Sequence, residues 1–193
     1  MEHKVNCIRR FLVLLAVLAA VCTLSFVLAH KQVEKLAYPQ KYQEYVTYYA
    51  DKYDLDPLIL YTFIRTESNF DPNAQSNVDA RGLLQITEVT FDWIKSNIAP
   101  TEALTFEDMY VPETNIRFGA YLIKYCLLRY QGDLSTAAAA YHSGWGTVDA
   151  LLEDSRYSEN GKTLTVYPYP QMRHYVRKIT QGYQRYQKIY SQI

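Results

Sequence analysis

The sequence predicts a mostly α-helical single domain that follows an N-terminal transmembrane helix. Three observations support this. Residues 11–29 contain no charged side chain. Apolar residues recur at three- and four-residue intervals through most of the remaining chain, which is the spacing of an amphipathic helix. Outside these segments no strand pattern extends beyond residues 164–167.

The composition argues against a nucleic-acid-binding protein and against a disordered chain. The 193 residues include 20 Lys and Arg against 20 Asp and Glu, so the formal net charge is zero. A nucleic-acid-binding protein normally carries a clear basic excess, and no nucleic-acid partner is expected. A hydrophobic content of 49% with 21% charged residues is that of a folded chain.

The N-terminal segment predicts a membrane anchor. Residues 11–29 are long enough, as a helix, to span the roughly 30 Å hydrocarbon core of a bilayer. Lys4, Arg9 and Arg10 precede them, so the positive-inside rule places residues 1–10 in the cytoplasm and the rest of the chain outside the cell. The competing interpretation is a signal peptide cleaved after Val27-Leu28-Ala29. We favour the uncleaved anchor, followed by a stalk at residues 30–40 and a domain at residues 41–193.

Local signals predict the helices of this domain in order. Tyr42, Tyr45 and Tyr49 share one helix face, and Tyr38 precedes them at the same spacing. Asp56-Pro57 is a typical helix start. The predicted helices are 57–69, one opening at Thr87-Glu88, 115–130, 134–141 and 171–191.

The segments between these helices are predicted to be loops. Residues 73–82 are polar, and residues 100–112 are expected to be irregular. Gly144-Trp145-Gly146 is expected to end the Ala-rich helix. The tyrosine-rich helices at the two ends of the domain are expected to pack near one another or against the rest of the domain.

The sequence does not indicate a metal site, a phosphate-binding loop or a reactive thiol. The four His residues lack metal-ligand spacing, and no Walker-type phosphate loop is present. Cys126 lies on an apolar helical stripe, which predicts a buried and inert thiol. We therefore expect neither a metal nor an organic cofactor.

Glu67 is the remaining candidate for a catalytic group. It ends an otherwise apolar helix, with Phe63, Ile64 and Phe70 close by in sequence. Partial burial and the negative end of the helix dipole both disfavour an ionised carboxyl and raise its pKa. A carboxylic acid that stays protonated near neutral pH is what glycosidic cleavage needs as a general acid. The alternative is a solvated Glu paired with Arg65.

Four blocks in order resemble the signature of lytic transglycosylases of the soluble, goose-lysozyme-like (SLT) type. The first joins Glu67-Ser68-Asn69-Phe70-Asp71-Pro72-Asn73-Ala74 to Gly82-Leu83-Leu84-Gln85-Ile86, with Thr90 at the family's Thr position. The others are Pro112-Glu113-Thr114-Asn115-Ile116 with Gly119 and Tyr121-Leu122, Ala138-Ala139-Ala140-Tyr141-His142-Ser143-Gly144, and Pro170-Gln171-Met172-Arg173-His174-Tyr175-Val176. The resemblance spans about residues 50–180 and implies a lysozyme-like fold. The departures from the family pattern are Asp79 for Gly, Leu84 for Met, Glu88 for Pro, His142 for Asn, Ser143 for Ala and Gln171 for Glu.

The resemblance implies a reaction and a set of site residues. Glu67 would act first as the acid and then as the base in cleaving the MurNAc–GlcNAc β-1,4 bond of peptidoglycan, leaving a 1,6-anhydro end. Ser68 and Gln85 would bind sugar groups, and Tyr141 would orient Glu67. Thr90, His142 and Tyr175 are further substrate-binding candidates, each with an alternative explanation: a turn cap for Thr90, a turn position for His142 and helix packing for Tyr175.

Two other functions remain open from the sequence. A muramidase on the same fold would use water in place of the C6 hydroxyl, and a peptidoglycan-binding scaffold would keep the fold without catalysis. The expected partners are peptidoglycan glycan strands and the membrane, the latter through the anchor. Residues 160–193 contain six basic and no acidic side chains, which predicts a solvated basic face on the last helix or a surface for an anionic partner.

Overall fold

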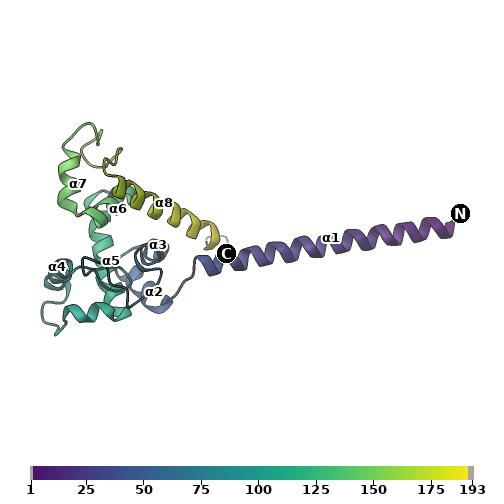
Figure 1. Ribbon diagram of the computed structural model, residues 1–193, viewed down its shortest axis with the longest axis horizontal. Coiled ribbons are helices and arrows are strands. Elements are labelled where there is room, and N and C mark those ends of the chain that lie inside the picture. The colour runs from purple at the N-terminus through teal and green to yellow at the C-terminus, as the bar shows by residue number, and fades with distance from the viewer. Residues whose placement is uncertain (1, 191–193) are drawn as a thin grey trace. The chain divides into compact units, whose positions relative to one another are not determined.

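A computed structural model of the chain describes residues 2–190, which separate into one unit that ends at Pro39 and a second that begins at Gln40. The first unit is the helix α1 (Glu2–Ala37) (Figure 1). Within it, Leu14–Ala37 is long and apolar enough to cross a membrane, by length and composition alone. The predicted stalk is therefore mostly a continuation of this helix, and the backbone leaves helical geometry only at Tyr38.

The second unit is built around the helix α3 (Pro57–Ser68) (Figure 1). Its start is the predicted one: the Asp56 side chain accepts a hydrogen bond of 2.8 Å from the Leu58 N–H, and Pro57 occupies the first turn. Leu60, Phe63 and Ile64 are buried. The helix ends at Asn69, whose φ of 52° is left-handed. α3 thereby buries its apolar stripe and leaves its last turn for the site.

Two tyrosine-bearing helices flank α3. The helix α2 (Gln43–Lys52) packs on α3 and on α5 (Pro112–Arg129), and the helix α8 (Pro170–Tyr190) packs on α3 and on α6 (Leu134–Ser143). The rings of Tyr61 and Tyr186 stack 5.9 Å apart between α3 and α8. The expectation that these helices pack against the rest of the domain is confirmed. The predicted end of α8 at Ser191 lies outside the described residues.

The predicted fold class is confirmed, with two local corrections. Residues 100–112 are not wholly irregular, because a short 3₁₀ helix (η1, Phe106–Tyr110) forms behind a capping box made by Thr105 and Asp108. The break at Gly144-Trp145-Gly146 is also narrower than predicted. Only Gly144 leaves helical geometry, with a φ of 80°, and a new helix α7 (Trp145–Leu152) begins directly after it.

The polar segment after α3 folds into a compact loop. It leads from Asn69 to the helix α4 (Glu88–Ile98), which begins at its predicted cap, Thr87. Isolated β-bridges join Gln75 to Arg81 and Arg81 to Ile86, and residues 164–167 form no strand. We call residues 69–87 the site loop, because the geometry described below places it beside Glu67.

Candidate active site

Glu67 lies in the last turn of α3 and receives a hydrogen bond from a different helix. The Tyr175 hydroxyl, on α8, donates to Glu67 Oε1. Burial raises the pKa of Glu67 to about 7, although the hydrogen bond from Tyr175 and the positive charge of Lys178 both act to lower it. A carboxyl with this pKa is largely protonated just below neutral pH and releases its proton just above it. This is the range in which one group can serve as acid and base in turn.

Two cavities meet at Glu67. The first, of about 330 Å³, lies toward the site loop and α4; its lining includes Glu67, Gln85, Thr90, Tyr141 and His142. The second, of about 480 Å³, lies toward α8; its lining includes Glu67, Gln171, His174, Tyr175 and Lys178. We call them the loop cavity and the helix cavity. Because Glu67 and His142 line both, the carboxyl can reach a ligand that extends in either direction.

Within the described linings of these two cavities, Glu67 is the single carboxylic acid. The other acids considered are engaged in the site loop. Asp71 accepts a hydrogen bond from the Asn73 N–H at 2.9 Å, as in an Asx turn. Asp79 is paired with Arg81, which lowers the pKa of Asp79 together with a hydrogen bond from Gln75. The arrangement thus offers one proton-transfer group rather than the two carboxylates of ordinary glycosidases.

Tyr175, and not Tyr141, donates the hydrogen bond to Glu67. The Tyr141 hydroxyl donates to the Leu84 carbonyl at 2.6 Å rather than to Glu67, so the expectation that Tyr141 orients Glu67 is not met. Tyr175 makes that contact. The physical reason is that α8 brings Tyr175 across the last turn of α3, while Tyr141 lies beneath the site loop and satisfies a backbone carbonyl there. The Phe63 ring packs edge-on against both, at 4.9 Å from Tyr141 and 6.4 Å from Tyr175.

Ser68 and Gln85 direct their donors to the backbone. Ser68 Oγ donates to the Leu83 carbonyl at 2.9 Å. Gln85 Nε2 donates to the carbonyls of Ala74 and Gly82 at 3.1 and 2.9 Å. Gln85 lines the loop cavity, whereas Ser68 is absent from the described lining of both cavities. In this structure Ser68 therefore ties the end of α3 to the site loop, and Gln85 braces the loop from the cavity wall.

Thr90 and His142 lie at the rim of the cavities. Thr90 lines the loop cavity, and its Oγ1 lies 2.9 Å from that of the cap residue Thr87. The His142 ring stacks on Tyr175 at 4.6 Å, and its partial desolvation lowers the pKa of His142. A neutral imidazole beside Glu67 can donate or accept a hydrogen bond without adding charge to the site.

Sequence reasoning did not identify the residues that hold the site loop in place. Asn115 is fully buried on α5. It accepts a hydrogen bond from the Leu84 N–H at 2.8 Å and donates to the carbonyls of Arg81 and Met109 at 3.0 and 2.8 Å. Gly82 lies against the same two groups: a Cβ there would collide with the Met109 carbonyl and the Asn115 amide. The signal was present in the Pro-x-x-Asn block, but only the fold shows what the Asn contacts.

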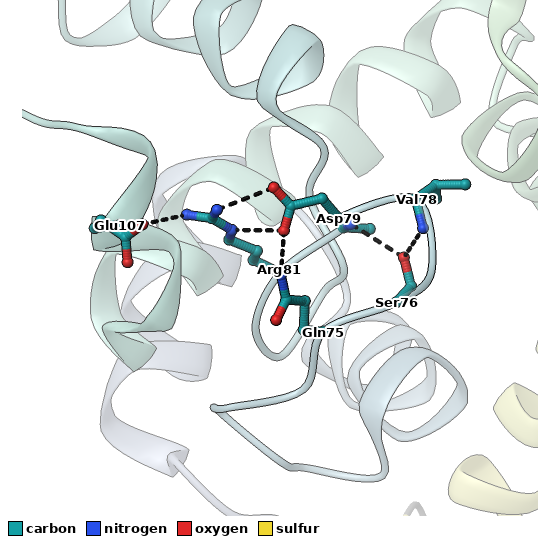
Figure 2. A network of polar contacts seen from close by, with 7 residues as sticks. Gln75, Ser76, Val78, Asp79, Arg81 and Glu107 are labelled. Carbon is teal, nitrogen blue, oxygen red and sulfur yellow. Dashed lines mark hydrogen bonds and ion pairs between the residues drawn. The ribbon is translucent and has the colours of Figure 1, made fainter.

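A polar network stiffens the outer side of the same loop (Figure 2). The Arg81 guanidinium pairs with Asp79 at 2.9 Å and with Glu107 of η1 at 2.8 Å, and Gln75 donates to Asp79. The guanidinium also lies 4.0 Å from the centre of the Phe106 ring. Asp79 has a φ of 57°, which explains why the SLT pattern can have Gly at this position. No group of three or more His, Cys, Asp or Glu side chains in the described residues is placed to hold a metal ion.

The chain is similar in sequence to several known proteins. The family model described as the transglycosylase SLT domain matches residues 44–163. Among curated relatives, a transglycosylase of Enterobacteria phage PRD1 is 36% identical over 100 residues, which cover 49% of this chain and 34% of the relative. The membrane-bound lytic murein transglycosylase C of Serratia proteamaculans is 26% identical over 172 residues, which cover 77% of this chain and 47% of the relative.

A solved structure gives the same fold. The 70 kDa soluble lytic transglycosylase of Escherichia coli superposes with a TM-score of 0.71 at 22% identity, covering 80% of this chain and 25% of that protein. The chain thus spans about a third to a half of the length of the two curated relatives and a quarter of this solved protein.

Proposed function

This chain belongs to the transglycosylase SLT family, and from that premise we propose that it is a peptidoglycan lytic transglycosylase that cleaves the MurNAc–GlcNAc β-1,4 bond. The observation that carries the proposal is Glu67: it lies between two cavities, its pKa is raised to about 7, and it is the single carboxylic acid in their described linings. One carboxyl that can both give and take a proton is sufficient for an intramolecular transfer.

In the proposed reaction the Glu67 carboxyl takes part in two successive proton transfers. Protonated Glu67 gives its proton to the glycosidic oxygen as the bond to MurNAc C1 breaks, and the acetamido group of the substrate stabilises the positive charge at C1. The Glu67 carboxylate then takes the proton of the MurNAc C6 hydroxyl, whose oxygen bonds to C1. The products are a GlcNAc end and a 1,6-anhydro-MurNAc end. No water is consumed, and Glu67 is protonated again.

The surrounding residues support this cycle in separate ways. Tyr175 fixes the orientation of Glu67 and donates to its ionised form, which stabilises the carboxylate after the first transfer. Gln85, Thr90, Tyr141 and His142 form the wall against which the sugars would lie. The backbone contacts of Ser68 and Asn115 keep that wall in place. Among these, only Glu67 is assigned a chemical step.

The proposed location is the outer side of a cell membrane. The helix within Leu14–Ala37 is sufficient to cross a bilayer, and Arg9 and Arg10 precede it, which favours a cytoplasmic N-terminus. A cleaved signal sequence would have the same length and composition. We propose the uncleaved anchor because of the basic residues before it and the length of its apolar run. In either case the domain from Gln40 onward would reach the cell wall.

Product analysis tests the reaction directly. Purified glycan strands digested with the full chain should yield 1,6-anhydro-MurNAc ends, identified by mass spectrometry. Products with reducing MurNAc ends, each heavier by one water, would instead identify a muramidase. No cleavage under any condition would favour a binding scaffold and overturn the enzymatic proposal.

The pH dependence tests the role of Glu67 and its partner. Because the active form at the start of the cycle is protonated, kcat/KM should fall as pH rises through about 7. Tyr175→Phe removes a hydrogen bond that lowers the pKa of Glu67, so this falling limb should move to higher pH by about one unit. Tyr141→Phe is the matched control, since its hydroxyl binds the Leu84 carbonyl. A shift toward lower pH in Tyr175→Phe would contradict the assignment.

A further inference from the structure

The two tryptophans of the chain lie together where three helices meet. Trp93 is on α4, Trp145 is the first residue of α7, and their ring centres are 4.9 Å apart. Tyr125 of α5 packs edge-on against both, at 4.8 and 5.3 Å. Tyr121, also on α5, lies 5.7 Å from Trp93. We call these four rings, which connect α4, α5 and α7 (Figure 1), the aromatic platform.

The aromatic platform is partly exposed and is separate from the core between the same helices. All four of its side chains retain solvent contact, whereas Phe91 of α4 and Phe118 of α5 are buried and stack on one another. The helix α7 is also held by other contacts, because Asp149 pairs with Arg129 of α5 and Val148 is fully buried. The platform rings are therefore not the main attachment between these helices.

The aromatic platform begins at the rim of the loop cavity. Three residues in the lining of that cavity are each followed three positions later by a platform ring, and residues at this spacing share one face of a helix. The pairs are Thr90 and Trp93 on α4, Leu122 and Tyr125 on α5, and His142 and Trp145 across the break at Gly144. A ligand that leaves the loop cavity between these three segments would pass over the platform.

The loop cavity is too small for a long glycan strand. Its volume of about 330 Å³ is near the lower end of the range for pockets that hold a single small molecule. A strand of many sugars bound at Glu67 must therefore continue past the rim of the cavity. The platform lies on one such continuation.

The chemistry of the aromatic platform suits an uncharged sugar. The basic side chains of α5 on either side of Tyr125 are balanced by acids, since Lys124 pairs with Asp54 and Arg129 with Asp149. The platform thus presents ring faces with polar tips beside neutralised charges. A sugar can place its C–H face on such a ring while its hydroxyl groups stay in water, and Tyr and Trp are suited to surfaces of this half-wet kind.

We propose that the aromatic platform binds a sugar of the glycan strand beyond the loop cavity and makes the enzyme prefer long strands to short ones. The inference deepens the proposed function and rests on it. Neither Trp93 nor Trp145 belongs to the four sequence blocks that resemble the SLT pattern, so that resemblance does not imply this site.

Tryptophan fluorescence tests the binding directly, because Trp93 and Trp145 are the two tryptophans of the whole chain. The full chain carrying Glu67→Gln should be titrated with GlcNAc oligosaccharides of increasing length. A hexasaccharide should change the emission at concentrations at which a disaccharide does not. Emission that no oligosaccharide changes, while the wild type cleaves long glycan, would overturn the platform. Emission that depends on protein concentration alone would identify a second copy of the chain as the occupant and also overturn it.

Cleavage kinetics test the preference for long strands. Trp93→Ala should lower the ratio of kcat/KM on long strands to kcat/KM on short fragments about tenfold, the loss of one stacked ring, and the change should lie mainly in KM. Trp93→Tyr keeps a ring and should recover part of the ratio. Tyr48→Ala is the matched control, because it removes an exposed ring of α2 outside the platform, and it should leave the ratio unchanged.

The outcomes separate this inference from the proposed function. Equal losses on long and short substrates for Trp93→Ala would show that the ring supports the fold, and would overturn the platform while leaving the proposed function intact. If the wild type cleaves neither substrate, the proposed function fails, whereas the fluorescence titration still reports whether the platform binds sugars.

Discussion

Glu67→Gln removes glycan cleavage, with the rate of anhydro-end formation expected to fall at least about 10³-fold, because general acid–base catalysis contributes factors of this order and one group carries both proton transfers. Gln keeps the size of the side chain and can still accept the Tyr175 hydrogen bond through its amide oxygen, but it cannot donate an acidic proton. The measurement is the initial rate of 1,6-anhydro-MurNAc release from purified glycan.

The same substitution should make the folded protein more stable at alkaline pH. The pKa of Glu67 is about 7 in the folded state and 4.5 as an ordinary side chain. Ionisation therefore costs more in the folded chain, and the stability of the wild type falls as pH rises from about 4.5 through 7. Relative to wild type, Glu67→Gln should have a higher Tm at pH 8 and a similar Tm at pH 4.

Glu159→Gln is the control, because Glu159 is exposed and outside both Glu67 cavities. It should change neither activity nor the pH dependence of Tm. A Glu67→Gln protein that cleaves glycan at the wild-type rate would exclude Glu67 as the acid. An inactive but less stable variant at pH 8 would show that the carboxyl supports the fold rather than the chemistry.

Gly82→Ala should be the most destabilising single-methyl substitution in the site loop. The residue has a φ of 73°, and an added Cβ would collide with the backbone carbonyl of Met109, which cannot move away as a flexible side chain could. The collision also displaces the Asn115 amide that holds Leu84 and Arg81. Overpacking of 1–3 kcal/mol and the strain of positive φ together predict a loss of about 3 kcal/mol, measured from urea unfolding of the full chain.

Gly132→Ala distinguishes the steric overlap at Gly82 from the strain of a positive φ. Gly132 has a similar φ of 81°, but no atom lies within 4 Å of an added Cβ, so this variant should lose only the conformational part, about 1 kcal/mol. Equal losses for the two variants would show that backbone strain alone matters and that the contact with Met109 and Asn115 is unimportant. Catalysis should fall in Gly82→Ala only, since the site loop forms the wall beside Glu67.

Local sequence signals predicted the helices and the catalytic candidate because both depend on neighbours in the chain. The Asp56-Pro57 start and the Thr87 cap are formed by adjacent residues, and each lies where it was expected. The apolar stripe of α3 similarly predicted that Glu67 would be partly buried. The start of α7 was missed because a Gly-Trp-Gly sequence usually ends a helix, and here only its first glycine does so.

Contacts across long sequence separations could not be predicted in the same way. The spacing of Tyr175 fitted helix packing as well as a site role, and only the crossing of α8 over α3 brings its hydroxyl to Glu67. Tyr141 was the more obvious partner by resemblance, but its hydroxyl is taken by a backbone carbonyl of the site loop. The clamp by Asn115 likewise depends on η1 and the site loop meeting at one end of α5.

The burial of Glu67 links folding to proton uptake. In an unfolded chain this carboxyl is an ordinary one with a pKa of 4.5 and has lost its proton at pH 7. Folding buries it and raises its pKa to about 7, although Tyr175 and Lys178 of α8 act to lower that value. Folding near pH 7 should therefore draw protons from solvent, to an extent set by these opposing effects.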